Sequence, residues 1–392
     1  MNNLNKNIAL TLVLCSIVAS IWYLESKKPP INSVGSDDII LNSNNTENEI
    51  SVPQTNAKSS TTAETTVSAQ KIISDRSSIR AKKATEYPRA KELVDPQGFI
   101  NSAPFKLADI VGKKVVLIDF WTYSCINCVR TIPYLNAWYE KYKDLGLEIV
   151  GVHSPEFDFE KNYDNVLKAV QQLGIKYPVV LDSNHETWDA YQNLYWPREY
   201  LIDIDGFIVH DQIGEGSYSD TEQAIQQALR ERDSALGLMI PIPSSIVNPS
   251  DVITMDQSKV QSPETYFGSA RNQYLSNGQQ NVSGSQTLSL PDNFQPNSLY
   301  LDGTWNFEDQ YAENTSTSAN IVFQYNAKNV YFVASSQTGV PIKIFQDGKL
   351  INTLTVKDNK LYTLVQNSDY GQHTLQIEVD GAGLQAFTFT FG

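Results

Sequence analysis

Residues 115–128 read Val-Val-Leu-Ile-Asp-Phe-Trp-Thr-Tyr-Ser-Cys-Ile-Asn-Cys, and this stretch decides the fold. Its first half is a short apolar run rich in β-branched side chains, which is typical of a buried parallel strand. A helical pattern follows from Cys125 to about Lys143, and Pro133 inside it should kink the helix. The sequence therefore places two cysteines where a buried strand gives way to a helix.

The segments that follow continue this alternation of strand and helix. We expect a strand over 148–153, a helix over 159–173, a hairpin around Asp205-Gly206 and a last helix that begins near Ser219 and runs to about Arg232. Parallel strands joined by helices, followed by an antiparallel hairpin, form a mixed sheet with helices on both faces. The sequence thus predicts an α/β domain over residues 87–232.

The cysteine count bears on the chemistry. Cys15 lies in an apolar N-terminal stretch, which leaves Cys125 and Cys128 as the only pair in the rest of the chain. A bridge between them would close too small a loop to add much stability, so reactivity explains the pair better. At a helix N-terminus, unpaired N–H groups and the helix dipole stabilise a thiolate on Cys125, and Cys128 lies one turn deeper. This arrangement predicts an attacking and a resolving thiol.

A zinc site and a purely structural bridge are the alternatives to redox use of the pair. Zinc usually takes four ligands, whereas this sequence offers no further cysteine outside the N-terminal stretch and only scattered histidines. We therefore expect no metal and no bound cofactor, only a redox-active disulfide.

Four other residues complete the predicted site. Asp119, six residues before Cys125, should lie beneath the pair and exchange a proton with Cys128; the alternative is an ordinary strand-end carboxylate bound to backbone. A cis bond between Trp196 and Pro197 would present backbone groups to an extended substrate, and a trans helix stop is the alternative. Trp121 is a candidate shield for the disulfide or simply a core residue.

Composition limits the partners. The chain has 392 residues with 30 basic and 44 acidic side chains, a formal net charge of −14, so nucleic-acid binding is disfavoured. Its length is enough for two domains plus linkers.

Glu156, after the second strand, is a candidate site residue, although we expect a solvated loop carboxylate there.

The N-terminus contains an apolar run over residues 8–24, which is at the lower limit for a membrane-spanning helix. We expect residues 1–28 to be an uncleaved membrane anchor, with a cleaved signal peptide or lipid attachment at Cys15 as alternatives. Residues 29–86 are rich in serine, threonine, asparagine and acidic residues, which predicts a disordered tether.

The C-terminal third has a different composition. Residues 233–261 contain several prolines and predict a second linker, and residues 262–392 contain many short strand-like runs without a convincing helix. Such spacing indicates a β-sandwich. Trp305, Tyr300 and Tyr311 could stack on sugars or simply fill the core.

Several motifs carry a family resemblance. Residues 120–128, 151–156 and 195–203 resemble the DipZ branch of TlpA-type thioredoxins, and the similarity continues through 262–268. It implies a thioredoxin fold at 87–232, followed by a jelly roll like a carbohydrate-binding module at 262–392. By position, the resemblance gives Cys125 the attacking role, Cys128 the resolving role, Pro197 the cis-proline role and Asp119 the role of the buried acid.

The resemblance also implies a function. It implies an extracytoplasmic thiol–disulfide oxidoreductase, which we expect to act as a reductant of client proteins in the periplasm or cell envelope. Because the sequence has one short apolar segment, we expect a separate membrane electron relay of the CcdA/DsbD type to recharge it. Thr131 stands where many haem-maturation relatives have a glutamate, which argues against cytochrome maturation.

Two alternative functions belong to other classes. A thiol peroxidase would use Cys125 together with Thr122, a partial match to the peroxiredoxin pattern. A glycan-binding or envelope-binding protein would act through residues 262–392.

Overall fold

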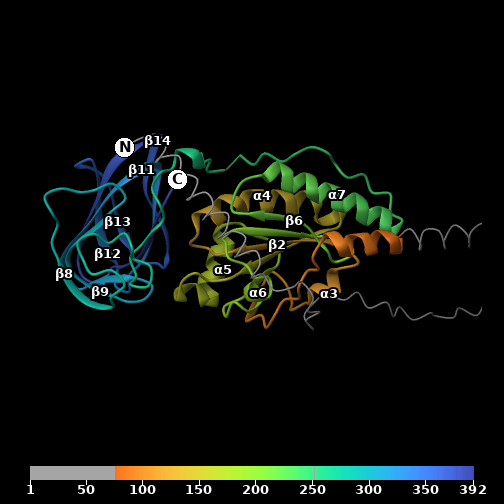
Figure 1. The fold of residues 1–392 in the computed structure, drawn as a ribbon, viewed down its shortest axis with the longest axis horizontal. Coiled ribbons are helices and arrows are strands. Elements are labelled where there is room, and N and C mark those ends of the chain that lie inside the picture. Colours follow the sequence, from red (N-terminus) through yellow and green to blue (C-terminus); the bar gives the residue numbers. More distant parts are fainter. Residues whose placement is uncertain (1–75, 251) are drawn as a thin grey trace, which may run out of the picture. The chain divides into compact units, whose positions relative to one another are not determined.

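The computed structural model describes residues 76–250 and 252–392 (Figure 1). The predicted anchor at 1–28 and most of the predicted tether at 29–86 lie outside the described residues. Within the described part of the chain, no helix is both long and apolar enough to cross a bilayer.

The first domain contains a six-stranded mixed sheet in the order β1-β4-β3-β2-β5-β6. Strands β2, β3 and β4 run parallel, and β1, β5 and β6 are antiparallel to their neighbours. All seven residues of the central strand β2 are buried, as its apolar run predicts for a strand covered on both faces. The strands are β1 (Gly98–Ile100), β2 (Val115–Trp121), β3 (Leu147–His153), β4 (Val179–Leu181), β5 (Arg198–Ile202) and β6 (Ile208–Ile213).

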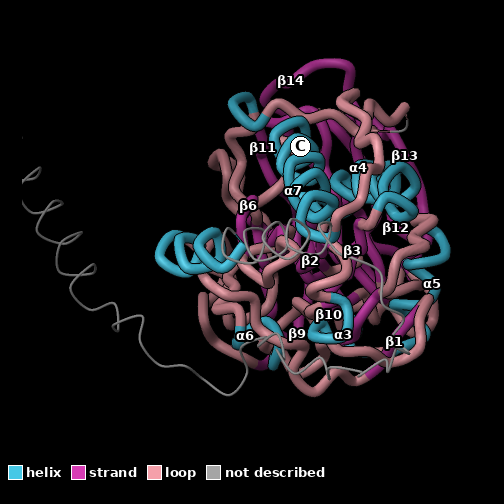
Figure 2. The backbone as a smooth tube through the Cα atoms, turned by 90° about the vertical axis from the view of Figure 1, so that its right-hand side faces the viewer, coloured by secondary structure: helices cyan, strands magenta, loops and turns pink. Residues whose placement is uncertain are grey.

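Helices cover both faces of this sheet (Figures 1 and 2). Alternate residues of β2 pack against different helices. Leu117 and Trp121 pack in one core cluster with side chains of α4, α5 and α7, whereas Ile118 and Phe120 pack in another with α3 and α6. The helices are α3 (Leu107–Ile110), α4 (Ile126–Tyr142), α5 (Tyr163–Gln172), α6 (Glu186–Ala190) and α7 (Tyr218–Leu236). The predicted mixed sheet with helices on both faces is therefore confirmed.

Two segments differ from the sequence prediction. Residues 76–86, assigned to the disordered tether, are helical (orange in Figure 1). Lys83 and Arg76 on this helix form ion pairs with buried Asp203 and Asp205, more than a hundred residues away. Helix α7 also runs four residues into the predicted second linker before Gly237, with a positive φ of 66°, ends it.

The C-terminal domain is all β, as its strand-like runs predict. Hydrogen bonds join its nine strands into one sheet, and the long strand β11 pairs with β14, β15 and β9, so that part of the sheet closes on itself like a small barrel. The strands are β7 (Thr265–Tyr266), β8 (Gly284–Leu288), β9 (Leu299–Phe307), β10 (Ala312–Asn314), β11 (Ser318–Ser335), β12 (Val340–Gln346), β13 (Lys349–Val356), β14 (Lys360–Asp380) and β15 (Gln385–Phe391).

The aromatic residues that the sequence offered for sugar stacking are mostly core. Trp305 is fully buried and Tyr300 nearly so, whereas Tyr311 is half-buried. The stacking hypothesis therefore loses Trp305 and Tyr300, because a sugar cannot reach a ring enclosed by the core.

Candidate functional site

The two cysteines lie at the start of α4. Cys125 is the residue that caps the helix; its backbone is extended, and its side chain makes no capping hydrogen bond, so the sulfur stays available. It is half-buried, whereas Cys128, one turn further on, is 1% exposed. Because the first N–H groups of a helix have no intrahelical partner, they favour a thiolate at its opening turn. One sulfur can thus meet a substrate while the other is shielded.

Asp119 lies in β2, on the face of the sheet that packs against Cys128 of α4. Its carboxyl is 1% exposed, and its Oδ1 has no hydrogen-bond partner. Burial raises the pKa of Asp119 to about 8. Burial also raises the pKa of Cys128 well above that of an ordinary thiol, and the neighbouring Cys125 and Asp119 add to the effect. A carboxyl that titrates near neutral pH can exchange a proton with this thiol.

The backbone before Pro197 faces the nucleophile. The Trp196–Pro197 peptide bond is cis, and the carbonyl oxygen of Trp196 lies 3.9 Å from Cys125 Sγ. The indole of Trp196 is fixed, because its Nε1 donates to the Ser154 carbonyl at 2.9 Å and its ring packs on Trp188 at 4.3 Å. The structure therefore brings Trp196 and Pro197 to the cysteine pair.

Trp121 does not fit a substrate-binding role. Its side chain is fully buried, in the same core cluster as Cys128. It packs edge-on against His153 with ring centroids 5.1 Å apart, and burial lowers the pKa of that histidine to about 3, so the imidazole is neutral. Because helices cover both faces of β2, its last residue Trp121 lies in the core. The sequence alone could not distinguish this position from one at the surface beside the cysteines.

Some residues at the site were not predicted. Leu194 and Tyr195 precede the cis-proline and are 72% and 47% exposed, so they offer apolar surface in the segment that leads to Trp196. Buried Glu160 accepts hydrogen bonds from the backbone N–H and hydroxyl of Ser124, which fixes the turn before Cys125. The sequence could have indicated Leu194 and Tyr195, because apolar residues beside a proline are a usable signal. Glu160 leaves no such signal, since its contact joins it to Ser124, 36 positions away.

Arg130 is a further unpredicted residue. Its side chain is 1% exposed and donates to both carboxylate oxygens of Glu215 at 2.7 Å and to Asn127 Oδ1 at 2.6 Å. Asn127 lies between the two cysteines, so this contact anchors the redox turn. The guanidinium charge also interacts favourably with a thiolate at Cys125.

A pocket of about 360 Å³ opens at Cys125, and both domains line it. Glu156, expected to be a solvated loop carboxylate, is 10% exposed and accepts hydrogen bonds from Tyr266 Oη at 2.8 Å and Arg271 Nη1 at 2.7 Å. That expectation was wrong because its partners come from the other domain. The lining comprises Cys125, Ile126, Asn127, Glu156, Trp196, Met255, Gln257, Val260, Ser262, Glu264, Tyr266, Thr390 and Phe391.

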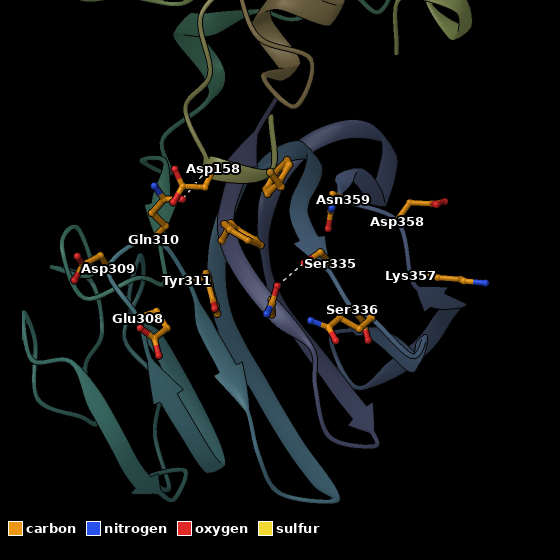
Figure 3. Close-up of a pocket in the computed structure, with 14 residues that line it drawn as sticks. Asp158, Glu308, Asp309, Gln310, Tyr311, Ser335, Ser336, Lys357, Asp358 and Asn359 are labelled. Carbon is orange, nitrogen blue, oxygen red and sulfur yellow. Dashed lines mark hydrogen bonds between the residues drawn. The ribbon is translucent and has the colours of Figure 1, made fainter. Parts of the chain in front are cut away.

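A larger, polar pocket of about 760 Å³ contains neither cysteine (Figure 3). Asp158 N–H donates to Gln310 Oε1 at 2.9 Å at one side of it, and Ser335 Oγ donates to Gln385 Oε1 at 2.8 Å. Half-buried Tyr311 lies between them (Figure 3). Carboxylates, amides and an aromatic ring are the groups that a sugar site would use.

One group of acids has oxygen atoms close enough to share a metal ion in the described part of the chain: Asp203, Asp205 and Glu231. Lys83 forms ion pairs with all three, and Arg76 with two of them. These cations occupy the place that a metal ion would take, so the group is explained by the attachment of the helix at 76–86.

Comparisons with known proteins agree with this geometry. The AhpC/TSA family matches residues 83–211, and the thioredoxin-like C-terminal domain family matches residues 262–392. DipZ of Mycobacterium tuberculosis is 39% identical over 306 residues, which are 77% of this chain and 43% of that protein. The thiol-disulfide oxidoreductase ResA of Bacillus thuringiensis is 34% identical over 128 residues, 30% of this chain and 70% of ResA. The thiol-disulfide oxidoreductase YkuV of Bacillus subtilis is 29% identical over 142 residues, 36% of this chain and 95% of YkuV.

The fold, the cysteine pair and these matches define a thiol–disulfide oxidoreductase built on the thioredoxin fold. The aligned part is less than half the length of DipZ, so what the whole of DipZ does is not carried over with it. The chain belongs to the TlpA-type thioredoxin family and is a homologue of DipZ.

Proposed function

We propose that the chain reduces disulfides of client proteins on the outer side of the cytoplasmic membrane. The observation that carries this proposal is the half-buried Cys125, 3.9 Å from the Trp196 carbonyl, with Cys128 and Asp119 buried beneath it. A client segment in extended conformation can pair with that backbone and so bring its disulfide to the nucleophile.

The exchange takes place in two steps. The Cys125 thiolate attacks one sulfur of the client disulfide, a mixed disulfide forms, and the other client sulfur leaves as a thiolate that takes a proton from water. Cys128 then gives its proton to ionised Asp119 and attacks Cys125 Sγ, which releases the second client thiolate. Two electrons pass from the dithiol to the client, and the product is the Cys125–Cys128 disulfide.

The direction of transfer is the part of the proposal that the redox potential tests. A strong oxidant such as DsbA has a reduced form that is stabilised as a thiolate. For a reductant we expect a potential nearer to about −270 mV, as in thioredoxin, than to about −120 mV, as in DsbA. Equilibration with glutathione measures it, and a value near the DsbA end would overturn the reductant proposal.

Clients can be captured with Cys128→Ser, which cannot resolve the mixed disulfide. We expect disulfide-linked adducts at Cys125 that disappear on reduction. Cys125→Ser/Cys128→Ser is the matched control and should trap none. Equal trapping by both variants would show that the adducts do not arise from the proposed exchange.

The cellular setting is part of the proposal. We propose that residues 1–28 anchor the chain, that the segment up to the first domain tethers it, and that a membrane relay of the CcdA/DsbD type returns electrons to it. The apolar run over residues 8–24 supports the anchor. Fractionation tests the anchor, and the redox state of Cys125 and Cys128 in cells that lack the relay tests the electron supply.

A thiol peroxidase is the second candidate, because the AhpC/TSA family matches residues 83–211. Its reaction would oxidise Cys125 to a sulfenic acid, which Cys128 would resolve. The Thr122 hydroxyl lies 3.5 Å from His153 Nε2 in the buried interior, which does not favour peroxide activation at Cys125. Peroxide consumption that is lost in Cys125→Ser would support this function.

For the C-terminal domain we propose a role like that of carbohydrate-binding modules, with glycan as ligand. The polar pocket beside Tyr311 supports the proposal (Figure 3). Binding of residues 76–392 to cell-wall glycans, compared with Tyr311→Ala, tests it. If neither protein binds, a spacer or docking role replaces it.

A further inference from the structure

Asp119 has a second acid directly opposite it. Strands β2 and β5 are antiparallel, and Asp119 and Glu199 are partners in their register. Directly opposed residues project to the same face of a sheet and lie close together. Glu199 is 2% exposed and Asp119 is 1% exposed, so two carboxyls share one buried place.

This place adjoins the resolving cysteine. Leu201 and Leu117, on the same faces of their strands as the two acids, belong to the core cluster that contains Cys128 and Tyr177. The Tyr177 hydroxyl is also buried, and Asp119, Glu199 and Cys128 all act on its titration. The carboxyls of Asp119 and Glu199, the Cys128 thiol and the Tyr177 hydroxyl therefore lie in one buried group.

Each acid in this group, and the tyrosine, keeps a polar atom without a partner: Asp119 Oδ1, Glu199 Oε2 and Tyr177 Oη. Buried polar atoms are normally hydrogen-bonded, because leaving them unpaired costs stability. A group of such atoms beside a redox thiol is better explained by proton transfer than by folding.

A path leads from Glu199 toward the surface. The Thr221 side chain on α7 lies close enough to the Glu199 carboxyl to lower its pKa, and its Oγ1 lies 3.0 Å from Nε2 of His210 on β6. His210 is half-buried, and burial lowers its pKa, so the ring is neutral near pH 7. The Thr221 hydroxyl can therefore accept from the imidazole while it donates to the carboxyl.

The groups that face the acids come from every element packed against them. They are Cys128 on α4, Tyr177 before β4, His210 on β6, and Tyr218 and Thr221 on α7. Within the described residues, no lysine or arginine contributes to the pKa of either acid. Neither carboxylate is therefore stabilised by a cation in this part of the chain, and each acid has the other carboxyl as its neighbour.

We propose that Glu199 is a positioning residue for the redox reaction, the second member of a buried acid pair that moves the proton of Cys128. Asp119 accepts the proton when Cys128 attacks Cys125, and Glu199 exchanges it with water through Thr221 and His210. The electrons go from the dithiol to the client disulfide, as in the proposed function on which this inference rests.

Electrostatics agrees with this geometry. Burial, together with the charge of Asp119, raises the pKa of Glu199 to about 8. Two interacting carboxyls lose their protons one at a time, and the two steps belong to the pair. The pair therefore releases protons around pH 8, and once one carboxyl is ionised it can take up a proton from Cys128.

The kinetic test follows resolution of a mixed disulfide between Cys125 and glutathione in single turnovers from pH 5.5 to 9.5. We expect Glu199→Gln to slow resolution about tenfold at pH 7. The rate plotted against pH should then show the titration of one carboxyl in place of two. In an Asp119→Asn background the same substitution should change the rate by less than about twofold, because Glu199 acts through Asp119. Asp211→Asn is the control: Asp211 opposes Tyr200 on the other face and is exposed.

The proposal is overturned if Glu199→Gln leaves the rate and profile unchanged, or if it has the same effect in both backgrounds. Should this variant fail to fold, Thr221→Val interrupts the outward path and should slow resolution by a similar factor.

Infrared spectroscopy of the carboxylic acid band provides a readout that does not require turnover. The oxidised wild-type chain should lose two buried acid signals in separate steps as pH rises. In Asp119→Asn, Glu199 should ionise at lower pH, because the like charge is gone. Signals that titrate independently would refute the pair even if the chain proves to be a reductant. If the potential instead refutes the reductant proposal, this titration still tests the pair.

Discussion

Strand β5 has acidic side chains at both ends, and the two groups differ in their partners. At one end Glu199 lies opposite Asp119 with no cation among the described residues that act on them. Just past the other end, Asp203 and Asp205 are equally buried but form ion pairs with Lys83 and Arg76. Equal burial thus leads to two outcomes. Carboxyls without cations titrate near neutral pH, whereas carboxyls with cations hold two segments together.

The pKa of Lys83 also reflects its contact with the buried acids. Burial lowers the pKa of Lys83, but its hydrogen bonds with Asp203 and Glu231 outweigh this, and the net shift is upward. A lysine with a raised pKa stays charged through the physiological range. The comparison therefore separates a proton-exchanging group from a structural group within one strand.

The largest expected effect comes from the group without cations. Asp119→Asn should slow resolution of the Cys125 mixed disulfide about 100-fold, because Cys128 loses its proton acceptor. Its thermal midpoint should not fall, since a buried carboxyl without a cation is removed. Stopped-flow kinetics and calorimetry measure the two quantities. A loss of stability with unchanged kinetics would reverse the assignment of this group.

The opposite pattern is expected at the group with cations. Lys83→Met leaves buried Asp203 and Asp205 with fewer partners and should lower the free energy of unfolding by about 2 kcal/mol. Resolution kinetics should not change. Urea unfolding provides the measurement, and Lys82→Met, at a largely exposed neighbour, is the matched control. A redox defect in Lys83→Met would show that the two groups are coupled.

The pH dependence of stability distinguishes the groups next. The raised pKa values mean that Asp119 and Glu199 bind protons in the folded state that they have lost in the unfolded state. Their contribution is present at low pH and is lost as pH rises from about 4 to about 8. Glu199→Gln should make this fall less steep by about 1.4 kcal/mol per pH unit.

This slope is measured by urea unfolding of the oxidised chain at pH 5.5, 6.5 and 7.5. Lys83 contributes no slope in this window, because its raised pKa places the loss of its contribution above pH 10. Equal slopes in wild type and Glu199→Gln would contradict the raised pKa of Glu199.

The smallest effect is expected at the ion pair of Arg271 with Glu156. The Arg271 side chain is 38% exposed, so Arg271→Ala should change the free energy of unfolding by less than about 1 kcal/mol. Because its partner Glu156 lines the pocket at Cys125, kcat/KM for a protein client should fall about threefold while that for glutathione disulfide stays constant. Steady-state assays with both substrates check this, and an equal fall with both would contradict it.

Local patterns accounted for the redox turn. The apolar run of β2, the helical pattern after Cys125 and the cysteine spacing all lie within about thirty residues, and the structure has the predicted strand and helix there. The cis bond before Pro197 also matches the expectation. Here the physical causes are the continuous apolar run of a strand buried on both faces, the periodicity of the helix and the restricted backbone at proline, which are written in neighbouring residues.

Long-range contacts account for what the sequence did not show. Glu199 sits in an apolar strand, and its meaning depends on the register with Asp119, eighty residues away. The helix at 76–86 reads as polar tether until Asp203 and Asp205 are placed beside it. Glu156 reads as a loop carboxylate until Tyr266 and Arg271 of the other domain reach it. Pairing between distant segments leaves no periodic signal.

The pocket at Cys125 has a consequence for the choice of client. Its walls come from two domains, and it measures about 360 Å³. A small disulfide can enter such a space whole, but a folded protein can reach the sulfur only with a narrow protruding loop. Selection would thus begin with the geometry of the approaching chain, before any sulfur is exchanged.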